Sequence, residues 1–408
     1  MVVDVFEVLL ARNAWEKRKL GELAKVRTGR AFKSSSFSPN GKYYVVTNKD
    51  IGGPQISTHM DGDRIDITNP VDIAKYSLSG RNLLVTMDGV NIGKTAMYSN
   101  EDAVLAQRVG RLTSSSLDFV HQITSQKNFL TRMNELSVGN AIKHISLKQI
   151  SDYAVNVPQQ TSERQLIGQT LSLLDNLIAA TQRRIDALEQ AKKALLQRLF
   201  DQSWRFKGYS DPWEKRKLGE TNSYFTDGNY GESYPKESEL SDKENGVPFL
   251  RGSNLRNGEL IEDNANYITK EKHAELTSGH LVEDDIVLAV RGSLGALGYV
   301  KDENIDWNIN SQLAVIRTDK SELSGKFLVQ FLLSWRGQKE LLSRNTGTAL
   351  KQLPIKQLKD VPVPIVNLDE QKEIGALFSS IDNLIAATQS RLSSLELLKK
   401  SLLQDLFI

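Results

Sequence analysis

Cysteine is absent from the 408 residues of this chain. This absence excludes disulfide bonds, cysteine-ligated zinc, iron–sulfur clusters and a thiol nucleophile. Long apolar runs are lacking too, because charged residues interrupt every hydrophobic stretch before the length of about 18 residues that a membrane helix needs. The run at residues 2–10 contains Asp4 and Glu7 and has no basic start, so it does not resemble a signal peptide. Together these features predict a cytoplasmic protein.

A strong excess of basic residues is also missing. The chain has 52 Lys and Arg against 50 Asp and Glu, a net charge of +2. Residues 15–160 hold 19 basic and 13 acidic side chains, whereas residues 213–360 hold 20 and 23. A uniformly basic nucleic-acid surface is therefore excluded, and any DNA binding must come from local clusters.

What the chain does contain is an internal repeat. The octapeptide Trp-Glu-Lys-Arg-Lys-Leu-Gly-Glu at residues 15–22 recurs unchanged at 213–220, and residues 175–182 recur unchanged at 382–389. Between them lies a weaker match of Gly139, Ala141, Lys143, Lys148, Gln149 and Asp152 with Gly347, Ala349, Lys351, Lys356, Gln357 and Asp360. A period of about 200 residues is too long for a solenoid, so the sequence predicts a duplicated domain.

The stretches between the repeated parts match only thinly. Candidate correspondences are Asp50 with Asn254, Asp88 with Arg291, and Gln107 with Gln312. Two copies with shared ends and different middles predict one scaffold that carries two different recognition modules.

The modules have the pattern of mixed α/β structure. Strand-like runs alternate with Gly, Asn and Asp turns, and a helix is expected near residues 326–343. The strand-like runs are residues 43–47, 83–87, 247–250, 286–290 and 313–317. The predicted fold class is α+β, with modules at 1–160 and 213–362, helices at 161–200 and 363–408, and a linker at 201–212.

The repeated helix has the heptad pattern of a coiled coil. Apolar residues recur at alternating spacings of four and three over about 33 residues, or about 50 Å of helix. The predicted seam comprises Leu174, Ile178, Ile185, Leu188 and Leu195 in the first copy and Ile381, Ile385, Leu392, Leu395 and Leu402 in the second. Each helix needs a partner for its apolar stripe, and the other copy in the same chain has the highest effective concentration. Spacing alone allows parallel or antiparallel pairing.

Polar residues interrupt this seam in both copies. Thr181, Thr388, Lys192 and Lys399 occupy seam positions and either fix the register or leave room for another protein. Alternatively, the lysines extend from the edge of the seam into solvent.

Several stretches imitate catalytic motifs without completing them. Residues 89–95 resemble a phosphate-binding loop, but Asp88 stands where that motif needs glycine. Residues 292–298 lack the close glycine pair of a dinucleotide loop, and a tight turn is the simpler interpretation. None of the five histidines has the spacing of a helical metal pair; His273 and His280 are expected to be solvated. The sequence therefore predicts no catalytic residue, no metal site and no cofactor bound by this chain.

The remaining polar residues of the modules suit DNA recognition. Arg, Lys, Asn and Gln form the contacts that distinguish base edges, and small polar groups hold phosphates. For any single residue a solvated surface role is the more common one, so the hypothesis depends on the set. The candidates are Arg30, Lys33, Asn48, Lys49, Arg81, Asn91, Lys94, Gln107, Arg108, Lys143, Arg251, Asn254, Arg256, Arg291, Ser293, Asn310, Gln312 and Lys351.

With these parts in view, the chain resembles a specificity subunit of a bacterial type I restriction-modification system. The resemblance rests on the duplicated octapeptide, on Glu163-Arg164-Gln165 and Asp369-Glu370-Gln371 at the two helix starts, and on the repeated Asp-Asn-Leu-Ile-Ala-Ala-Thr-Gln segment. It covers essentially the whole chain.

The resemblance implies a non-catalytic reader of double-stranded DNA. Each module, as a target-recognition domain, would read one half of a split, asymmetric site. The helices would pair antiparallel, space the modules and dock two modification subunits that carry S-adenosylmethionine and methylate adenine. Two restriction subunits would supply ATP-driven, magnesium-dependent translocation and cleavage.

Two other classes remain open from the residues. One is a coiled-coil scaffold that joins two protein-binding modules without nucleic acid. The other is a stand-alone nuclease or methyltransferase, against which the chain lacks an Asn/Asp-Pro-Pro-Tyr/Phe tetrapeptide and a cofactor-binding glycine fingerprint.

Overall fold

The computed structural model describes residues 15–51, 62–139, 143–347 and 351–407, so the run at residues 2–10 lies outside the described part. The chain forms two compact units. Unit 1 comprises Met1–Thr181 and Arg391–Ile408, and unit 2 comprises Gln182–Ser390. Each unit thus contains one module and part of both long helices, α7 (Thr161–Phe200) and α12 (Leu368–Leu406). Among the described residues, no helix is both long and apolar enough to cross a membrane.

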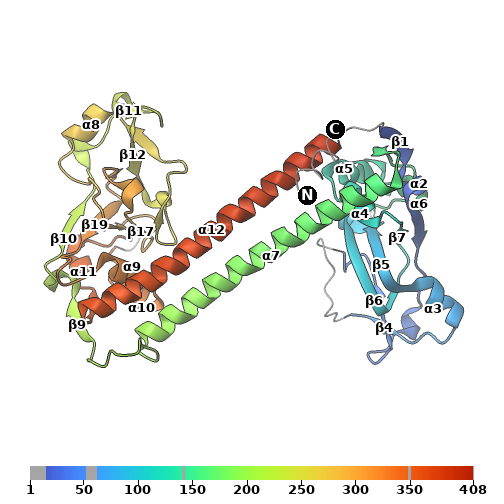
Figure 1. Ribbon diagram of the computed structural model, residues 1–408, viewed down its shortest axis with the longest axis horizontal. Coiled ribbons are helices and arrows are strands. Elements are labelled where there is room, and N and C mark those ends of the chain that lie inside the picture. The colour runs from blue at the N-terminus through green and yellow to red at the C-terminus, as the bar shows by residue number, and fades with distance from the viewer. Residues whose placement is uncertain (1–14, 52–61, 140–142, 348–350, 408) are drawn as a thin grey trace. The chain divides into compact units, whose positions relative to one another are not determined.

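A six-stranded sheet in the order β2-β7-β5-β6-β3-β4 forms the centre of the unit 1 module (Figure 1). Alternate residues of β5 enter different cores: Leu83 and Val85 pack with helix residues such as Phe129, while Leu84 packs with Val46 on the other face. The strands are β2 (Lys25–Thr28), β3 (Tyr43–Val46), β4 (Arg64–Ile65), β5 (Ser77–Thr86), β6 (Thr95–Leu105) and β7 (Val109–Thr113).

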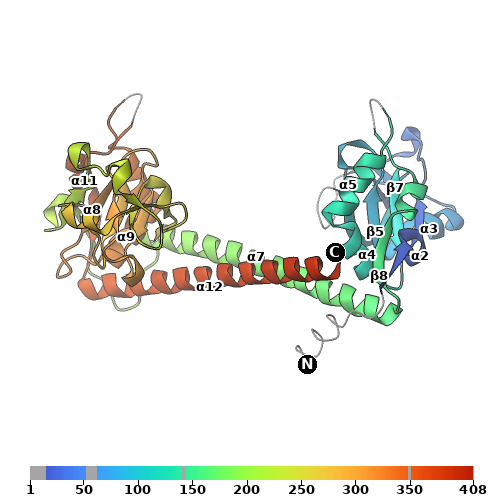
Figure 2. The same cartoon turned by 90° about the horizontal axis from the view of Figure 1, so that it is seen from above.

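Short helices accompany this sheet. Figure 2 shows α4 and α5 beside β5 and β7. The proline at the start of α3 and the capping box that Ser146 forms at the start of α6 fit helix N-termini. The helices are α2 (Leu20–Leu23), α3 (Pro70–Tyr76), α4 (Leu117–Thr124), α5 (Lys127–Leu136) and α6 (Leu147–Ser151).

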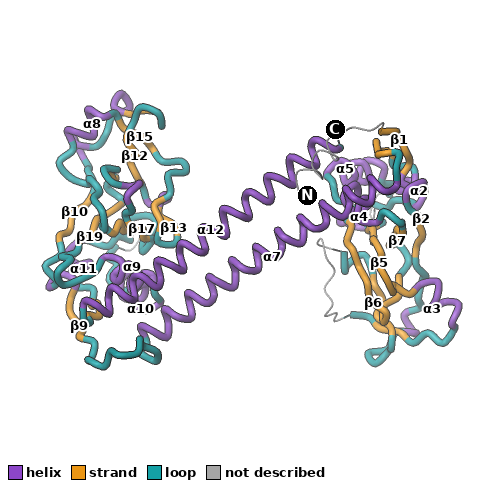
Figure 3. The backbone as a smooth tube through the Cα atoms, in the orientation of Figure 1, coloured by secondary structure: helices purple, strands orange, loops and turns teal. Residues whose placement is uncertain are grey.

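Unit 2 has the same plan with a divided sheet. In unit 1, β6 pairs antiparallel with β5 near its start and parallel with β3 at its end. In unit 2 these two roles fall to separate strands, β17 and β18, so two four-stranded sheets form, in the orders β10-β19-β16-β17 and β11-β15-β12-β18 (Figure 3). The strands are β10 (Tyr224–Asp227), β11 (Leu240–Ser241), β12 (Val247–Leu250), β13 (Leu255–Arg256), β14 (Glu259–Leu260), β15 (Asn266–Ile268), β16 (Ile286–Ala289), β17 (Leu297–Tyr299), β18 (Asn308–Ile309) and β19 (Leu313–Arg317).

The predicted mixed α+β modules are confirmed. All five strand-like runs fall on strands, while the helix expected near residues 326–343 is two helices, which Ser334 separates by capping the second. The helices of unit 2 are α8 (Lys270–Glu275), α9 (Gly325–Leu333), α10 (Trp335–Leu342) and α11 (Ile355–Lys359).

The repeated octapeptide forms a strand at the base of each long helix. β1 (Trp15–Lys19) pairs with β8 (Ala154–Pro158), which leads into α7, and β9 (Glu214–Lys217) pairs with β20 (Pro362–Ile365), which leads into α12. In each copy the second lysine of the octapeptide forms an ion pair of 2.8 Å, Lys19 with Asp152 and Lys217 with Asp360. The following Leu20 and Leu218 are fully buried.

The tryptophan of each octapeptide links this strand to the other helix of its unit. Trp15 packs edge-on against Phe407, and Trp213 packs edge-on against Phe200 at the end of α7, with ring centroids 6.0 Å apart in both cases. The tryptophan, the second lysine and the leucine of the octapeptide thus have equivalent surroundings in both copies.

The two long helices contact each other within each unit. In unit 1, Ile167, Leu171 and Leu174 of α7 share a core with Leu402 and Leu406 of α12. In unit 2, Leu196 and Leu199 near the end of α7 share a core with Ile374 and Phe378 near the start of α12. Within each unit, the start of one helix therefore packs with the end of the other.

The segment at residues 201–212 contains no α-helix or strand, yet it is held in place. Arg205 donates two hydrogen bonds of 2.7 Å to the fully buried carboxylate of Glu370, in the first turn of α12. A bidentate pair of this kind fixes direction as well as position. The predicted linker is thus anchored to unit 2.

Candidate nucleic-acid interface

Polar loops gather at matching strand ends in the two modules. Loop cluster 1 consists of residues 47–50, 88–94, 106–108 and 143–144. Loop cluster 2 consists of residues 251–254, 291–296, 310–312 and 351–352. In cluster 1 the segments meet through the contacts of Asp88 with Asn48, Arg108 and His144. In cluster 2, Arg291 meets Gln312 and Gln352 in the same way.

Main-chain hydrogen bonds fix the correspondence between the clusters. Met87 N donates to Arg108 O at 3.1 Å, and Val290 N donates to Gln312 O at 2.9 Å. Arg108, and not Gln107, is therefore the counterpart of Gln312. The sequence match of Gln107 with Gln312 is one residue out of register. It was based on the identity of the two glutamines, which does not reflect the main-chain hydrogen bonds.

The correspondence of Asp50 with Asn254 agrees with the structure. Asp50 Oδ2 accepts from Thr47 N at 2.7 Å, and Asn254 Oδ1 accepts from Arg251 N at 3.1 Å. Both side chains thus close the same kind of turn three residues upstream. Asn254 is fully buried, and its amide nitrogen donates to the Ile261 carbonyl at 2.9 Å and to the Asp263 carbonyl at 3.2 Å. Its predicted base contact is corrected to a structural role, because no donor is left for DNA.

The clusters carry opposite charges at one equivalent position. Asp88 is 7% exposed, and its carboxylate accepts from the Asn48 amide and, at 3.0 Å, from the Arg108 guanidinium. The counterpart Arg291 is exposed and donates to Gln352 Oε1 and Ser311 O, both at 3.3 Å. The same scaffold position therefore holds a carboxylate that binds an amide and a guanidinium in one module, and presents a cation in the other.

Glycines shape the turn that follows this position. Gly89 and Gly93 in cluster 1 have φ of 78° and 81°, and Gly292 and Gly295 in cluster 2 have 72° and 81°. A Cβ at Gly93 would meet Met133 at 2.9 Å, so a side chain is excluded by space as well as by backbone conformation. The stretches that imitate nucleotide-binding loops are tight turns between β5 and β6 and between β16 and β17.

Most predicted DNA-binding residues lie in the two clusters with side chains open to solvent. Asn48, Asn91 and Arg251 are half-buried, and Asn310 is buried with Oδ1 accepting from Gln312 N at 2.9 Å. The exposed members are Lys49, Lys94, Gln107, Arg108, Lys143, Arg291, Ser293, Gln312 and Lys351. Their base contacts remain predictions.

Four predicted residues lie outside the exposed cluster surfaces. Arg81 lies midway along β5 and pairs with Asp118, whose carboxylate raises the pKa of the guanidinium. Arg256 lies on β13 and borders a groove beside the long helices. The Arg30 side chain pairs with Asp72, and Lys33 is exposed in the loop after it. Both Arg81 and Arg256 are exposed outside the two clusters, and their base contacts remain predictions.

Sequence reasoning missed Asp88 as the centre of cluster 1, as well as His144 and its counterpart Gln352. The thin match of Asp88-Gly89 with Arg291-Gly292 was the available signal. The missed pairings of Asp88 with His144 and of Arg291 with Gln352 depend on long-range contacts that no local sequence pattern predicts.

A second duplicated feature is a groove beside the long helices in each unit. Groove 1, in unit 1, has a volume of about 620 Å³, and groove 2, in unit 2, about 770 Å³. Seven lining positions of groove 1 have repeat-related counterparts in groove 2. They are Asp175, Ile178, Glu396, Lys399, Lys400, Leu403 and Gln404, matched by Asp382, Ile385, Glu189, Lys192, Lys193, Leu196 and Gln197.

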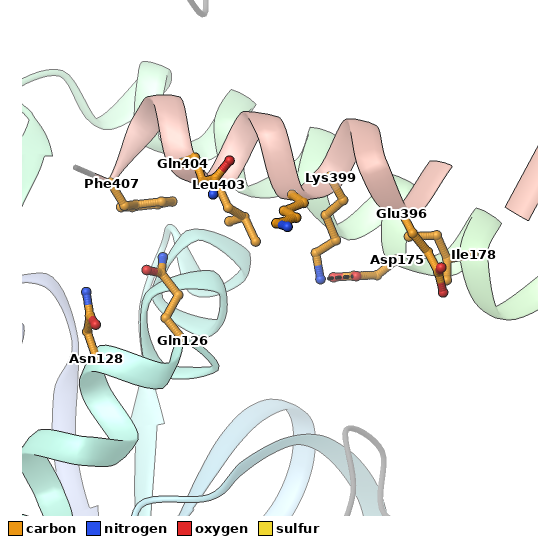
Figure 4. Close-up of a pocket in the computed structure, with 10 residues that line it drawn as sticks. Gln126, Asn128, Asp175, Ile178, Glu396, Lys399, Leu403, Gln404 and Phe407 are labelled. Carbon is orange, nitrogen blue, oxygen red and sulfur yellow. Dashed lines mark ion pairs between the residues drawn. The ribbon is translucent and has the colours of Figure 1, made fainter. Parts of the chain in front are cut away.

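Figure 4 shows the lining of groove 1. Leu403 of α12 and Phe407, which follows α12, project toward the segment that carries Gln126 and Asn128, and Lys399 reaches Asp175. The groove combines an apolar floor with charged and amide groups at its edges, which suits a protein partner.

The predicted seam residues are unevenly covered. Leu174, Ile185 and Leu402 are buried, while Ile178, Leu188, Leu195, Ile381, Ile385, Leu392 and Leu395 are half-buried. The hydroxyls of Thr181 and Thr388 donate to carbonyls four residues earlier, at 2.7 and 2.6 Å. Lys192 and Lys399 form ion pairs with the opposite helix and do not simply extend into solvent.

One grouping was not expected from the sequence. His273, which was expected to be solvated, is 8% exposed, and it lies with His280 and Asp306 in unit 2. The expectation failed because Asp306 is distant in the sequence and only the fold brings it to the two imidazoles.

Comparison with known proteins gives consistent matches over both halves. A family model described as "Type I restriction modification DNA specificity domain" matches residues 13–190 and 210–397. The specificity subunit of type I restriction enzyme MjaVIII from Methanocaldococcus jannaschii is 24% identical, over 95% of this chain and 91% of that protein. The EcoBI specificity subunit from Escherichia coli is 23% identical, over 98% and 87%. The crystal structure of a type I S subunit from M. genitalium has a TM-score of 0.66 at 19% identity and covers 98% of this chain and 97% of that one.

Proposed function

The chain belongs to the family of type I restriction-modification DNA specificity proteins. From this premise we propose that each of its two units recognises a different part of the DNA site. Sequence-specific DNA recognition is the function of the family. We propose that loop cluster 1 reads one half of a split, asymmetric site and loop cluster 2 reads the other. The observation that carries this division is the pair Asp88 and Arg291, opposite charges at one equivalent position.

The chemistry of the clusters supports different targets for the two modules. A carboxylate that orients Asn48 and Arg108 presents amide and guanidinium donors, which suit acceptors on purine edges. Cluster 2 offers Arg291 beside Gln312 and Ser293, a different arrangement of donors and acceptors. Two loop clusters with equivalent backbone positions and different polar groups fit an asymmetric bipartite site.

We propose that α7 and α12 form an antiparallel intramolecular coiled coil. In unit 1, Lys399 pairs with Asp175, and in unit 2, Lys192 pairs with Asp382. Lys192 of α7 and Lys399 of α12 are equivalent in the repeat, and so are Asp382 of α12 and Asp175 of α7. In each unit the lysine comes from one helix and the aspartate from the other, as an antiparallel register requires. The shared cores at the two helix ends support the same direction.

The grooves beside these helices suit two copies of one partner. Because seven lining positions of groove 1 have counterparts in groove 2, the same partner surface can fit both. We propose two modification subunits as these partners, with S-adenosylmethionine bound to them and adenine as the methylated base. Two restriction subunits with ATP and magnesium would join that assembly, which we place in the cytoplasm. In this proposal the chain itself is non-catalytic.

Mapping DNA methylation in cells with the chain and its modification subunit, against cells lacking only this chain, tests the proposal. A split motif with adenine methylation in both halves, lost with the chain, is expected. Binding of the purified complex to short duplexes with that motif separates it from a coiled-coil scaffold that joins two protein-binding modules. An unchanged methylation pattern, with the modification subunit expressed and bound, would count against it.

A further inference from the structure

We infer that His273, His280 and Asp306 form a binding site for a divalent transition-metal ion in unit 2. Their ligand atoms lie within 4.8 Å of one another. His273 Nε2 lies 3.2 Å from Asp306 Oδ1, and His280 Nδ1 lies 3.8 Å from the same oxygen. Ligand atoms held by one tetrahedral ion at about 2.1 Å lie about 3.4 Å apart, so the two measured separations fit one shared ion.

The hydrogen bonds of His280 leave the correct nitrogen free. Its Nε2 lies 2.7 Å from the carbonyl oxygen of Leu276. Because a carbonyl only accepts, Nε2 carries the proton and Nδ1 keeps its lone pair, directed toward Asp306. A main-chain carbonyl that fixes the tautomer and ring orientation of a histidine is the usual outer-shell partner of a metal ligand.

His273 is held on the opposite side of the carboxylate. Its side chain is 10% exposed, and its Nδ1 is buried without a hydrogen-bond partner among the described residues. Nε2 is therefore the nitrogen through which this ring interacts. The two rings meet edge to face with centroids 4.4 Å apart, so both imidazoles are already gathered.

Asp306 supplies the accessible ligand. Its side chain is 74% exposed, which leaves a route from solvent and room for water as a further ligand. Its backbone has φ of 67°, a conformation that aspartate tolerates better than most residues. Hydrogen bonds of 2.9 Å from Asp306 N to Leu281 O and from Leu281 N to Trp307 O hold this segment beside the histidines.

The ligand set indicates the class of ion. Two imidazoles and one carboxylate suit zinc and neighbouring first-row divalent ions, whereas magnesium and calcium prefer oxygen ligands. Asp306 lies in the segment that divides β17 from β18, where unit 1 has the single continuous strand β6, while His273 lies on α8 and His280 lies between α8 and β16. A bound ion would tie α8 to the start of β18, which leads directly to Asn310 and Gln312 of loop cluster 2. Its role would be to hold that part of module two in place.

The test uses the full-length chain, purified with its partner subunits if needed, free of affinity tags and stripped with a chelator. Cobalt(II) is titrated and followed by its visible absorption, and zinc is followed by the melting temperature. Asp306→Asn and His280→Asn are the test variants, and His144→Asn, an exposed histidine of unit 1, is the control. Asparagine accepts the positive φ at position 306, so Asp306→Asn should retain the fold.

Wild type and His144→Asn should show saturable cobalt absorption and a melting temperature that rises with zinc. Asp306→Asn should bind at least about tenfold more weakly, and His280→Asn should lose the absorption. Wild type without saturable absorption, or with binding that both test variants leave unchanged, would overturn the inference. A response of the melting temperature to pH but not to zinc or cobalt would also overturn it, in favour of a metal-free histidine pair.

Discussion

Lys192 Nζ lies 2.6 Å from Asp382 Oδ1, joining the last part of α7 to the first part of α12 within unit 2. The repeat places Lys399 and Asp175 at the same two positions, and these residues also pair within unit 1. The heptad pattern alone predicts that both lysines weaken the seam or extend from its edge. Their pairing gives them a specific role, because a lysine at a seam position selects the register in which a carboxylate meets it.

Reversing one charge of this pair should destabilise unit 2. Lys192→Glu places two carboxylates side by side at a site that is 13% exposed for the lysine and 23% exposed for the aspartate. The expected loss is about 1–3 kcal/mol, between the values for exposed and buried pairs. Four of the five tryptophans, at 204, 213, 307 and 335, lie in unit 2, so fluorescence during urea unfolding reports mainly on this unit.

Exchanging both charges tests whether the loss of stability comes from this ion pair or from the substitution at position 192 in general. Lys192→Glu combined with Asp382→Lys should recover at least half of the lost stability, because attraction is restored with the same geometry. Lys193→Glu, an exposed neighbour on the same helix, should change little. Failure of the double variant to recover would contradict the antiparallel register.

A change in loop cluster 1 should alter one half of the recognised motif only. Arg108→Ala removes an exposed guanidinium that the buried Asp88 positions, and the loss of one base contact typically costs about 1–3 kcal/mol of discrimination. We expect methylation mapping to show relaxed specificity in the half-site read by unit 1, with the other half unchanged.

Arg81→Ala is the matched control for that experiment. Arg81 is also exposed and also paired with an aspartate, but it lies midway along β5 and outside loop cluster 1. Its removal should leave both halves of the motif intact. Equal effects of the two substitutions would mean that loop cluster 1 is not the reading surface.

The sequence predicted the scaffold better than the site. The identical octapeptides and the heptads correspond to contacts that recur in both units, such as the burial of Leu20 and Leu218. Local sequence patterns were therefore enough to predict the scaffold. The direction of the helix pairing came only from the family resemblance, because a 4,3 spacing is symmetric with respect to chain direction. The linker was recognised from its composition, but not the anchor between Arg205 and Glu370, which are far apart in the sequence.

Residue types alone were a weaker guide to the recognition surface. The sequence predicted Asn254 and Arg291 alike as DNA-binding residues. In the structure Asn254 is a fully buried turn residue, whereas Arg291 is an exposed hydrogen-bond donor. Burial and hydrogen-bond partners separate them, and both depend on how distant loops meet. The cluster of His273, His280 and Asp306 was missed for the same reason, because its third member comes from the segment that divides β17 from β18.

Acidification should weaken unit 1 through His121. Burial on α4 lowers the pKa of this imidazole from its ordinary value of 6.5, with smaller effects from Asp175, Lys399, Asp118 and Arg81. Below pH 6.5 the unfolded chain therefore binds more protons than the folded chain, and stability falls as the pH falls toward the lowered pKa. Amide hydrogen exchange of α4 at pH 8 to pH 5 should show faster opening below about pH 6.5.

His121→Gln should remove the part of this pH dependence that comes from the imidazole. Protection of α4 in that variant should be flatter over the same range, while His144→Gln, at an exposed position, should behave like wild type. A pH dependence that is identical in His121→Gln would assign the effect to other groups of unit 1.

Lengthening the proposed coiled coil should lengthen the DNA spacer. One heptad inserted after Thr181 in α7 and another after Thr388 in α12 keeps both seams in phase and adds about 10.5 Å of helix. That length corresponds to about 3 base pairs of duplex and about a third of a turn. The mapped motif should keep both half-sites and gain about 3 base pairs between them. Insertion into α7 alone mismatches the seam and should abolish methylation. A double-insertion variant that folds, methylates and keeps the original spacer would show that the helices do not set the spacing.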